Sequence, residues 1–481
     1  MSDRADQARP ANKVRFVTAT TLFDGHDASI NVFRRILQAS GAEVIHLGHN
    51  RSGEEIVDAA VEEDAQAIAV TSYQGGHMEF FRYLRDLTVD RGAEYIRIFG
   101  GGGGTILPEE GEELAGYGIA RIYSPDDGRS LGLQGMVDDM LSRADFPLGE
   151  LDGVDLAELG TDNPRLVGRL ISAAENYPDK YPEVFEEVRR RAAASDGPVV
   201  GVTGTGGSGK SSLVDEVVRR YLAEYRDRTI AVVSVDPSRR RSGGALLGDR
   251  IRMNAIHHPR AYMRSLATRQ PNLALSPHVQ AAVDVARAAG FNLVILETSG
   301  IGQSDTEIVD HCDVSVYVMT PEYGAATQLE KTDMLDYADL VAINKADKQG
   351  ALDALRDVRK QVRRNRVKFH GDDTDLPVYL TVASDFNDPA TNLFYRALTE
   401  AVSVKTGLSF PVRLSLPVDP AEKQYVVPPG RTRYLAEIVE SIRQYDAWVE
   451  EQADAVEDLY RIEGAKSVGV TGRGRTATGH A

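Results

Sequence analysis

Short apolar runs alternate with amphipathic stretches from Val14 onward, a pattern typical of strands separated by helices. In this first part of the chain we predict strands at residues 14–18, 43–47, 67–71, 96–99 and 119–123. Strands connected through helices form right-handed crossovers, so we expect a parallel sheet with helices on both faces. The five strands predict a flavodoxin-like (Rossmann-type) domain at residues 13–147, with its ligand beyond the carboxyl ends of the strands.

A second alternation of strands and helices begins near residue 198. Its predicted strands lie at residues 198–202, 229–235, 293–297, 314–319, 340–344 and 378–381. They predict a second α/β domain at residues 197–416, joined to the first by a charged helical connector at residues 148–196. A helical linker at residues 417–466 contains an amphipathic helix from about Arg433 to Tyr460. Residues 1–12 and 467–481 have no apolar period and are predicted to be disordered tails.

Composition narrows the class of protein. A chain of 481 residues is too long for one hydrophobic core. Its formal net charge of −17 argues against a nucleic-acid partner, which needs clustered Lys and Arg. The single cysteine, Cys312, excludes an intramolecular disulfide and fits a reducing cytoplasm. No segment has the roughly 20 apolar residues of a membrane helix, and the polar N-terminus lacks the features of a secretory signal. We therefore expect a cytoplasmic protein with no membrane contact.

A phosphate-binding loop follows the first predicted strand of the second domain. Residues 204–211, GTGGSGKS, match the motif G-x-x-x-x-G-K-[ST], and a helical run comes next. Backbone N–H groups and the helix N-terminus would surround the phosphates, Lys210 would bridge them, and the Ser211 hydroxyl would hold Mg²⁺. The residues expected to contact nucleotide here are Gly207, Ser208, Gly209, Lys210, Ser211 and Ser212. Lys210 is also the expected catalytic group.

A guanine-specific motif stands after a later strand of the same domain. Asn344, Lys345, Ala346 and Asp347 match N-K-x-D. An Asp carboxylate can accept hydrogen bonds from both N1–H and the exocyclic amine of guanine, a donor pair that adenine lacks. The motif therefore favours GTP over ATP.

Acidic residues suited to a metal lie between these two motifs. Asp236 and Glu297 end predicted strands, and Asp249 lies in the loop between them. Mg²⁺ prefers oxygen ligands in octahedral geometry, so these carboxylates together with Ser211 predict a magnesium site. The alternative is that some of them cap helices or pair with arginines.

Four segments carry a family resemblance. They are VDPS at 235–238, GGALLGDRIRM at 243–253, RSLATR at 264–269 and ETSGIGQS at 297–304. Together they resemble the GTPase chaperones of adenosylcobalamin-dependent acyl-CoA mutases. The resemblance implies that Arg252 approaches the phosphates and that the main chains of Val235 and Thr298 join the metal shell. It also implies that Gln303 orients the attacking water.

A spaced pattern in the first domain resembles the cobalamin-binding signature D-x-H-x-x-G, S-x-L, G-G. Its elements are Asp24-Gly25-His26 followed by Ser29, then Ser72-Tyr73-Gln74, then Gly101-Gly102. Ser29 replaces the signature's Gly and Gln74 replaces its Leu. A plain exposed loop is the alternative for Asp24-Gly25-His26 alone, but three elements at three strand ends favour the ligand site.

The resemblance implies a cobalt ligand and a slot. His26 would face cobalt through a neutral imidazole nitrogen, while Asp24 accepts from the other ring nitrogen and fixes the tautomer. The benzimidazole tail of the cofactor would enter a slot lined by small residues, Ser72 and the loop 100–104. Two nearby histidines, His49 and His77, are expected to be surface residues.

Over residues 14 to about 464 the chain resembles the N-terminal portion of the fused isobutyryl-CoA mutases, and segments 71–77, 122–129 and 431–438 add to the resemblance. In that family a cobalamin domain, a GTPase chaperone domain and a helical linker precede a substrate-binding TIM barrel. A barrel needs about 250 residues, and this chain ends where it would begin. The resemblance implies a component that binds adenosylcobalamin, Mg²⁺ and GTP and uses GTP hydrolysis to gate cofactor loading.

Such a component would need a separate barrel chain to isomerise acyl-CoA, and we expect a homo-oligomeric assembly. Two alternatives remain open. One is a freestanding G-protein chaperone that delivers adenosylcobalamin to a mutase. The other is a corrinoid carrier for methyl transfer, against which the GTPase domain argues.

Overall fold

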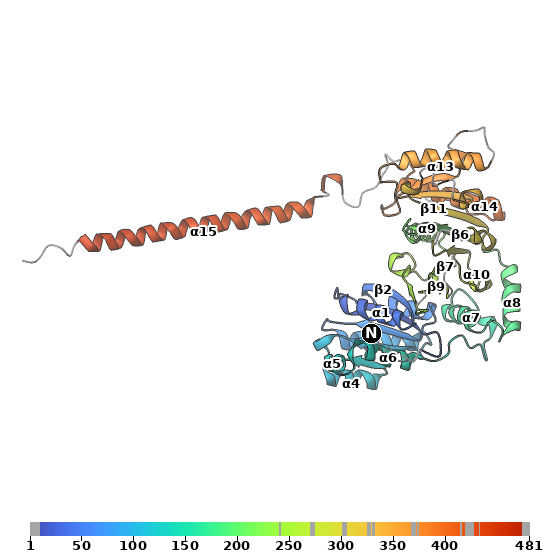
Figure 1. Ribbon diagram of the computed structural model, residues 1–481, viewed down its shortest axis with the longest axis horizontal. Helices are drawn as coiled ribbons and strands as arrows, with labels where there is room; N and C mark the ends of the chain where they lie inside the picture. The colour runs from blue at the N-terminus through green and yellow to red at the C-terminus, as the bar shows by residue number, and fades with distance from the viewer. Residues whose placement is uncertain are drawn as a thin grey trace, which may run out of the picture. The chain divides into compact units, whose positions relative to one another are not determined.

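Figure 1 shows the computed structural model of the chain. It describes residues 10–239, 242–269, 275–300, 305–324, 329, 332–366, 372, 375–413, 416–418, 428–431 and 433–473. The chain divides into a large unit up to Lys423 and a second unit from Gln424. The large unit contains two parallel sheets, and the second contains one long helix.

The first sheet contains the five strands predicted for the N-terminal part. They are β1 (Arg15–Thr21), β2 (Glu43–Arg51), β3 (Ala67–Thr71), β4 (Arg97–Gly101) and β5 (Arg121–Tyr123). They lie in the order β5-β4-β3-β1-β2 and all pair in parallel. This is the flavodoxin-like order, so the predicted fold of this domain is confirmed. The order reverses between β1 and β3, and ligands of such sheets lie at that point.

Helices cover both faces of this sheet. They are α1 (Ala28–Ala39), α2 (Gly53–Glu62), α3 (His77–Asp90), α4 (Pro108–Tyr117), α5 (Pro125–Ser130) and α6 (Gly132–Ala144), with the short helix η1 (Gly103–Thr105). Ile30 of α1 and Val137 of α6 belong to the core on one face, whereas Ile56 of α2 and Phe81 of α3 belong to the core on the other. The N-terminal segment is held at Ala11, whose N–H donates to Asp145.

The predicted helical connector consists of η2 (Leu156–Glu158), α7 (Pro164–Asn176) and α8 (Pro182–Ala193). Asn163 caps α7 by accepting from the N–H of Leu166. Leu170 of α7 and Val188 of α8 lie in the same hydrophobic core as Val283 of α10 (Val279–Ala288). The connector is therefore packed onto the second sheet.

The second sheet has seven parallel strands in the order β13-β12-β11-β6-β10-β7-β9. They are β6 (Val199–Gly204), β7 (Ile230–Asp236), β9 (Ala261–Ala267), β10 (Leu293–Glu297), β11 (Val314–Met319), β12 (Leu340–Asn344) and β13 (Val378–Thr381). With α10, the helices around it are α9 (Lys210–Glu224), α12 (Met334–Tyr337), α13 (Ala351–Asn365), α14 (Pro389–Thr406), η3 (Arg250–Arg252), η4 (Asp305–His311) and η5 (Pro321–Tyr323). Six strands were predicted, and edge strand β9 was missed.

A strand from the second half of the sequence completes the first sheet. β8 (Ala245–Leu247) lies beside β2, with Glu43 opposite Ala245 and Ile45 opposite Leu247. The order of the first sheet is therefore β5-β4-β3-β1-β2-β8. Sequence analysis did not predict this strand, which is only three residues long.

Buried charges join the two sheets around β8. The groups involved are Arg15, Glu43, Glu63, Glu175, Arg250, Arg264 and Arg269, whose side chains are buried or nearly so. Glu63, at the end of α2, accepts from Ser265 on β9, from Arg250 and from Arg15. Each carboxylate has more than one cationic or hydroxyl donor, as buried charges require.

Burial alone would raise the pKa of Glu175, but the positive charges of Arg269, Arg15 and Arg264 outweigh it and hold this pKa below its ordinary value. The pKa of Glu43 is lowered in the same way, mainly by Arg269 and Arg15 against the effect of burial. The carboxylates therefore stay ionised inside the protein, and the cluster depends on their charge.

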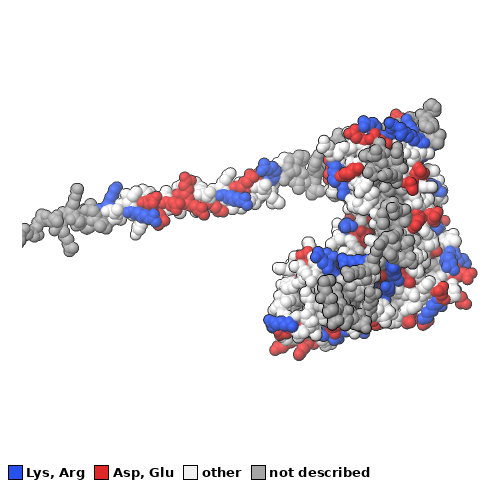
Figure 2. All heavy atoms as spheres, viewed as in Figure 1, with Lys and Arg blue, Asp and Glu red and all other residues white. Residues whose placement is uncertain are grey.

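The second unit consists of η8 (Pro429–Arg431) and α15 (Tyr434–Arg473). The helix runs past Lys466 into the segment predicted to be disordered, and residues 474–481 lie outside the described part. Large apolar side chains on α15 are exposed at Leu435, Ile438, Ile442, Tyr445, Val449, Val456 and Leu459, at spacings of three, four and seven residues that place them along one face. Charged side chains of both signs occupy other parts of its surface (Figure 2). None of the helices in the described ranges is long and apolar enough to cross a bilayer.

We predict that Glu63→Gln lowers the free energy of unfolding by about 3–5 kcal/mol, because Arg15 and Arg250 lose a buried counter-charge while the shape of the side chain is kept. Urea denaturation followed by circular dichroism measures this change. The control is Asp126→Asn, which breaks a solvent-exposed pair with Arg129 and should cost at most about 1 kcal/mol. Equal effects of the two substitutions would contradict the role assigned to the cluster.

Candidate functional site

The loop after β1 presents a histidine held by a buried carboxylate. Asp24 Oδ1 lies 2.7 Å from His26 Nδ1 and accepts from the His26 backbone N–H at 2.9 Å. The Asp24 side chain is almost fully buried, whereas 77% of the His26 side chain is exposed. A carboxylate only accepts, so Nδ1 carries the hydrogen and Nε2 is left as a free ligand nitrogen.

Asp24 also reaches the next strand end. Its Oδ2 accepts from the backbone N–H of Tyr73 at 2.6 Å. Burial would raise the pKa of Asp24, but hydrogen bonds from Tyr73 and His26 hold it below its ordinary value. The anion that orients His26 is therefore stable in the folded protein.

Neighbouring segments of backbone come close together at three strand ends, which explains why the predicted pattern has a serine and glycines there. Ser72 is fully buried, donates its N–H to Gly101 O at 2.9 Å and accepts from the Thr21 hydroxyl. A Cβ at Gly102 would lie 1.9 Å from Ser72 O, so only glycine fits there. Gly25, by contrast, has open space around it.

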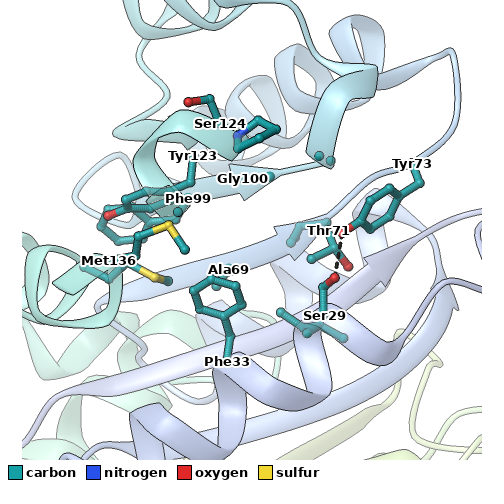
Figure 3. Close-up of a pocket in the computed structure, with 18 residues that line it drawn as sticks. Ser29, Phe33, Ala69, Thr71, Tyr73, Phe99, Gly100, Tyr123, Ser124 and Met136 are labelled. Carbon is teal, nitrogen blue, oxygen red and sulfur yellow. Dashed lines mark hydrogen bonds between the residues drawn. The ribbon is translucent and has the colours of Figure 1, made fainter. Parts of the chain in front are cut away.

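A cavity of about 220 Å³ opens beside this loop (Figure 3). Gly100 to Gly103 form part of its wall, whereas Ser72 and Gly104 are not among the residues that line it. Much of the remaining lining is apolar and was not predicted: Phe33, Ala69, Phe99, Tyr123, Met136 and Met140 contribute to it. These residues come from α1, α6 and strands β3, β4 and β5, so no local signal in the sequence marks them as neighbours.

The Ser29 side chain, at the position where the signature has glycine, lines the cavity and has a partner there. Its Oγ lies 2.6 Å from the hydroxyl oxygen of Tyr73, and the pair is visible in Figure 3. The expectation for His77 was wrong: this side chain is buried and its Nε2 lies 3.0 Å from Glu110. His49 is exposed, as expected.

The phosphate-binding loop joins β6 to α9 with the predicted geometry of strand, loop and helix. Gly209 has φ +88°, and α9 begins at Lys210. Lys210 is largely buried and its Nζ donates to Gly204 O at 3.1 Å. Within the described residues, the hydroxyls of Thr205 and Ser208 are buried without a hydrogen-bond partner. The loop therefore presents unsatisfied donors suited to an anion. Ser212 lies in the first turn of the helix.

Ser211 brings two of the predicted metal-site carboxylates together. Its hydroxyl lies 3.0 Å from Asp249 Oδ1 and 2.8 Å from Glu297 Oε1. Asp236 lies nearby and accepts from the N–H of Gly248 at 3.0 Å. Arg252 is mostly exposed and reaches Asp249 at 3.3 Å.

These carboxylates are electrostatically unsatisfied. Burial, followed by the charge of Asp249, raises the pKa of Asp236 to about 8 and raises the pKa of Glu297 well above its ordinary value. Glu297 Oε2 is buried and has no hydrogen-bond partner among the described residues. Unpaired buried carboxylates of this kind fit a divalent cation, which would favour their ionised forms.

No three Asp, Glu, His or Cys side chains in the described parts of the chain lie close enough to hold a metal by themselves. A Mg²⁺ bound here would take Ser211, phosphate oxygens and waters, with the carboxylates beside the waters. Val235 lies on β7 with its side chain in the core, so only its main chain is available. The Thr298 hydroxyl lies 2.7 Å from the Thr203 hydroxyl. Gln303 lies outside the described residues.

The N-K-x-D residues follow β12 and separate into two roles. Asn344 is buried; its amide donates to Ser208 O at 2.8 Å and accepts from the N–H of Ala383 at 3.1 Å. Lys345 donates to Gly207 O at 2.7 Å, and the N–H of Ala346 donates to Thr381 O. Asp347 is exposed. Asn344, Lys345 and Ala346 thus hold the phosphate-binding loop against the end of β13, whereas Asp347 remains available to contact a guanine base.

Comparison with known proteins identifies both domains. Residues 14–126 match the B12 binding domain, and residues 167–387 match the methylmalonyl Co-A mutase-associated GTPase MeaB. The chain is 54% identical over 468 residues to the fused isobutyryl-CoA mutase of Geobacillus kaustophilus, which covers 95% of this chain and 43% of that protein. It is 52% identical over 464 residues to the fused isobutyryl-CoA mutase of Cupriavidus metallidurans, covering 95% and 42%.

The chain spans less than half the length of these curated relatives. Its two sheets are the cobalamin-binding domain and the GTPase domain that the family models describe. The chain thus combines a B12 binding domain with a MeaB-type GTPase domain, and over 95% of its length it is similar to the fused isobutyryl-CoA mutases, to whose N-terminal portion it corresponds.

Proposed function

We propose that this chain is the adenosylcobalamin-binding GTPase component of an acyl-CoA mutase acting on isobutyryl-CoA and n-butyryl-CoA. The observation that carries the proposal is the presence, in one folded unit, of a carboxylate-held His26 beside an apolar cavity and of a phosphate loop beside unsatisfied carboxylates. GTP hydrolysis gates the loading of the cofactor.

His26 Nε2 would bind the cobalt ion of the cofactor, and Asp24 fixes the ring and its tautomer. Residues at the ends of β3 and β4, together with α1 and α6, hold the benzimidazole tail in the cavity. A flat apolar base suits a lining of aromatic and methionine side chains, which removes it from water. Bound adenosylcobalamin supplies the radical chemistry of the rearrangement.

In the GTPase site, the backbone of Gly207 to Ser212 and the Lys210 ammonium hold the phosphates. Ser211 is a direct ligand of Mg²⁺, with Asp236, Asp249 and Glu297 around it and main-chain contacts at Val235 and Thr298. Arg252 stands at the open side of this group and turns from Asp249 toward the phosphates. Asp347 selects guanine, and Gln303 orients the water that attacks the terminal phosphate.

The substrate half of the reaction requires a mutase barrel chain. The apolar face of α15 is the surface we assign to that partner, because seven large side chains are exposed along it. A freestanding chaperone that delivers the cofactor is the second candidate. Co-purification with a barrel chain at fixed stoichiometry favours the mutase component, whereas transient binding favours the chaperone.

We predict that His26→Ala abolishes the absorbance change that accompanies replacement of the benzimidazole by histidine on cobalt. Asp24→Asn should keep the change but weaken cobalamin binding about 10- to 100-fold, because the ring loses its charged acceptor. The control His49→Ala replaces an exposed histidine outside the loop. An unchanged spectrum in His26→Ala would show that another group binds cobalt.

We predict that Ala69→Leu blocks the tail cavity. Ala69 lines the cavity from the central strand β3, so the larger side chain should cost about 1–3 kcal/mol of cobalamin binding, a loss of about five- to hundredfold. Cobinamide, which lacks the nucleotide tail, serves as the matched ligand and should bind the variant and the parent alike. Equal losses for both corrinoids would place the tail elsewhere.

We predict that Lys210→Ala lowers the rate constant of GTP hydrolysis by about a hundredfold or more, since a preorganised charge on the reacting phosphate is lost. Phosphate release under saturating GTP and Mg²⁺ measures it. Lys405→Ala, which breaks a surface contact with Asp339, is the control and should keep the parent rate. Full hydrolysis by Lys210→Ala would exclude the phosphate loop as the catalytic site.

A further inference from the structure

Asp236 and Asp249 both lie at the GTPase site, but β8, which stands between them in the chain, pairs with the sheet of the cobalamin domain. β7 ends at Asp236, and η3 begins directly after Asp249. The hydrogen bond from Gly248 N–H to Asp236 holds the two ends together. Between them β8 is paired with β2 of the first sheet. The proposed metal site is therefore joined to the cobalamin sheet by covalent chain on both sides of β8.

Beyond β8, Ile251 of η3 packs on the backbone of β2. A Cβ at Gly48 would lie 2.9 Å from Ile251 Cδ1 and 3.2 Å from Cγ1, so the Ile251 side chain, which is 39% exposed, lies directly against Gly48. Gly48 has φ +85°, and the pairing with β1 changes register here, because Thr18 lies opposite His46 but Ala19 lies opposite Gly48. Ile251 thus contacts β2 at its irregular point, where a strand bends most readily.

Two residues further along, β2 holds the loop that carries the cobalt ligand. Asn50 Oδ1 accepts from the N–H of Phe23 at 2.8 Å, and Phe23 directly precedes Asp24. Asn50 has φ +57° and Phe23 has φ +64°. A bulky residue keeps a left-handed conformation only where its surroundings hold it, so the Asn50 contact sets the position of the loop.

We propose that Ile251 is a positioning residue that transmits the nucleotide state of the GTPase site to the cobalamin loop through Gly48 and Asn50. This inference rests on the proposed function, because it needs both ligands. Through these contacts bound GTP changes the affinity for cobalamin, and bound cobalamin changes the affinity for GTP by the same factor, because coupling between two binding sites is reciprocal.

The change at the nucleotide site starts with Ser211. Its hydroxyl lies within hydrogen-bond distance of both Asp249 and Glu297, but its single hydrogen can be donated to only one of them, so a cation held by the Ser211 oxygen would displace the other contact. Arg250, which directly follows Asp249 in the chain, is buried, and its guanidinium donates to Glu62 and Glu63 of the cobalamin domain. Because Arg250 holds this end of η3, a shift of Asp249 turns η3 about that anchor and moves Ile251 against Gly48.

The test measures coupling in the full chain. Cobalamin affinity is titrated by absorbance with and without a saturating non-hydrolysable GTP analogue and Mg²⁺. The parent should show a ratio of the two dissociation constants of about fivefold or more, and the analogue's affinity should change by the same factor when cobalamin is bound. Ile251→Ala should bring both ratios to about one, while the affinity for each ligand alone stays close to that of the parent.

Asn50→Gly is the second variant, because glycine keeps the left-handed backbone and removes only the acceptor of Phe23 N–H. It too should abolish the coupling. Leu393→Ala, which replaces an exposed apolar residue on α14, is the control and should keep the parent ratio.

Hydrogen exchange without cobalamin gives an independent readout: the GTP analogue should change exchange at residues 22–26 and 47–50 in the parent but not in Ile251→Ala.

Two outcomes overturn the inference: a parent ratio of one, or a parent ratio retained in Ile251→Ala. Either can occur in a protein that binds both ligands normally, which leaves the proposed function standing. If the parent binds neither cobalamin nor the GTP analogue, the proposed function itself fails.

Discussion

The buried ionic cluster around Glu63 is the constraint on which the arrangement of the large unit depends. Glu63 directly follows α2 in the cobalamin domain, yet it accepts from Ser265 and Arg250 of the GTPase domain. Charges withdrawn from water are tolerated only when their partners stay in place. The cluster therefore holds β9 and η3 against the cobalamin sheet, and β8 can pair with β2 only because these neighbours are held there.

The two kinds of buried carboxylate in this protein behave in opposite ways. Glu43 and Glu175 face several arginines, whose positive charges outweigh burial and lower the pKa of each carboxyl group. Asp236 and Glu297 face another carboxylate, and burial together with that charge raises their pKa values. Burial thus stabilises the structure where cations are built in and leaves carboxylates suited to a cation where they are not. The unsatisfied charge of Asp236 and the stable pairing of Arg250 with Glu62 and Glu63 lie close together in the chain, which suits a part of the protein that responds to a ligand.

Local patterns predicted most of the strands because each is a short apolar run between helices, and the phosphate loop because its residues are consecutive. The Asp24–His26 contact was also predicted, since a single residue separates its partners along the chain. The cavity lining was not predicted, because Phe33, Met136 and Tyr123 meet only after the sheet has formed. β8 escaped prediction for the same reason: three apolar residues become a strand only beside β2.

The sequence by itself determined the two α/β domains, the phosphate loop and the histidine with its carboxylate, because each depends on residues close together in the chain. The tertiary structure decided how these parts meet. It placed Asn344 in the protein's own hydrogen bonds, buried His77, lined the cavity beside the His26 loop largely with apolar side chains and set Ile251 on Gly48. These outcomes depend on residues tens to hundreds of positions apart, whose contacts are set by the packing of the sheets and by the buried charges between them.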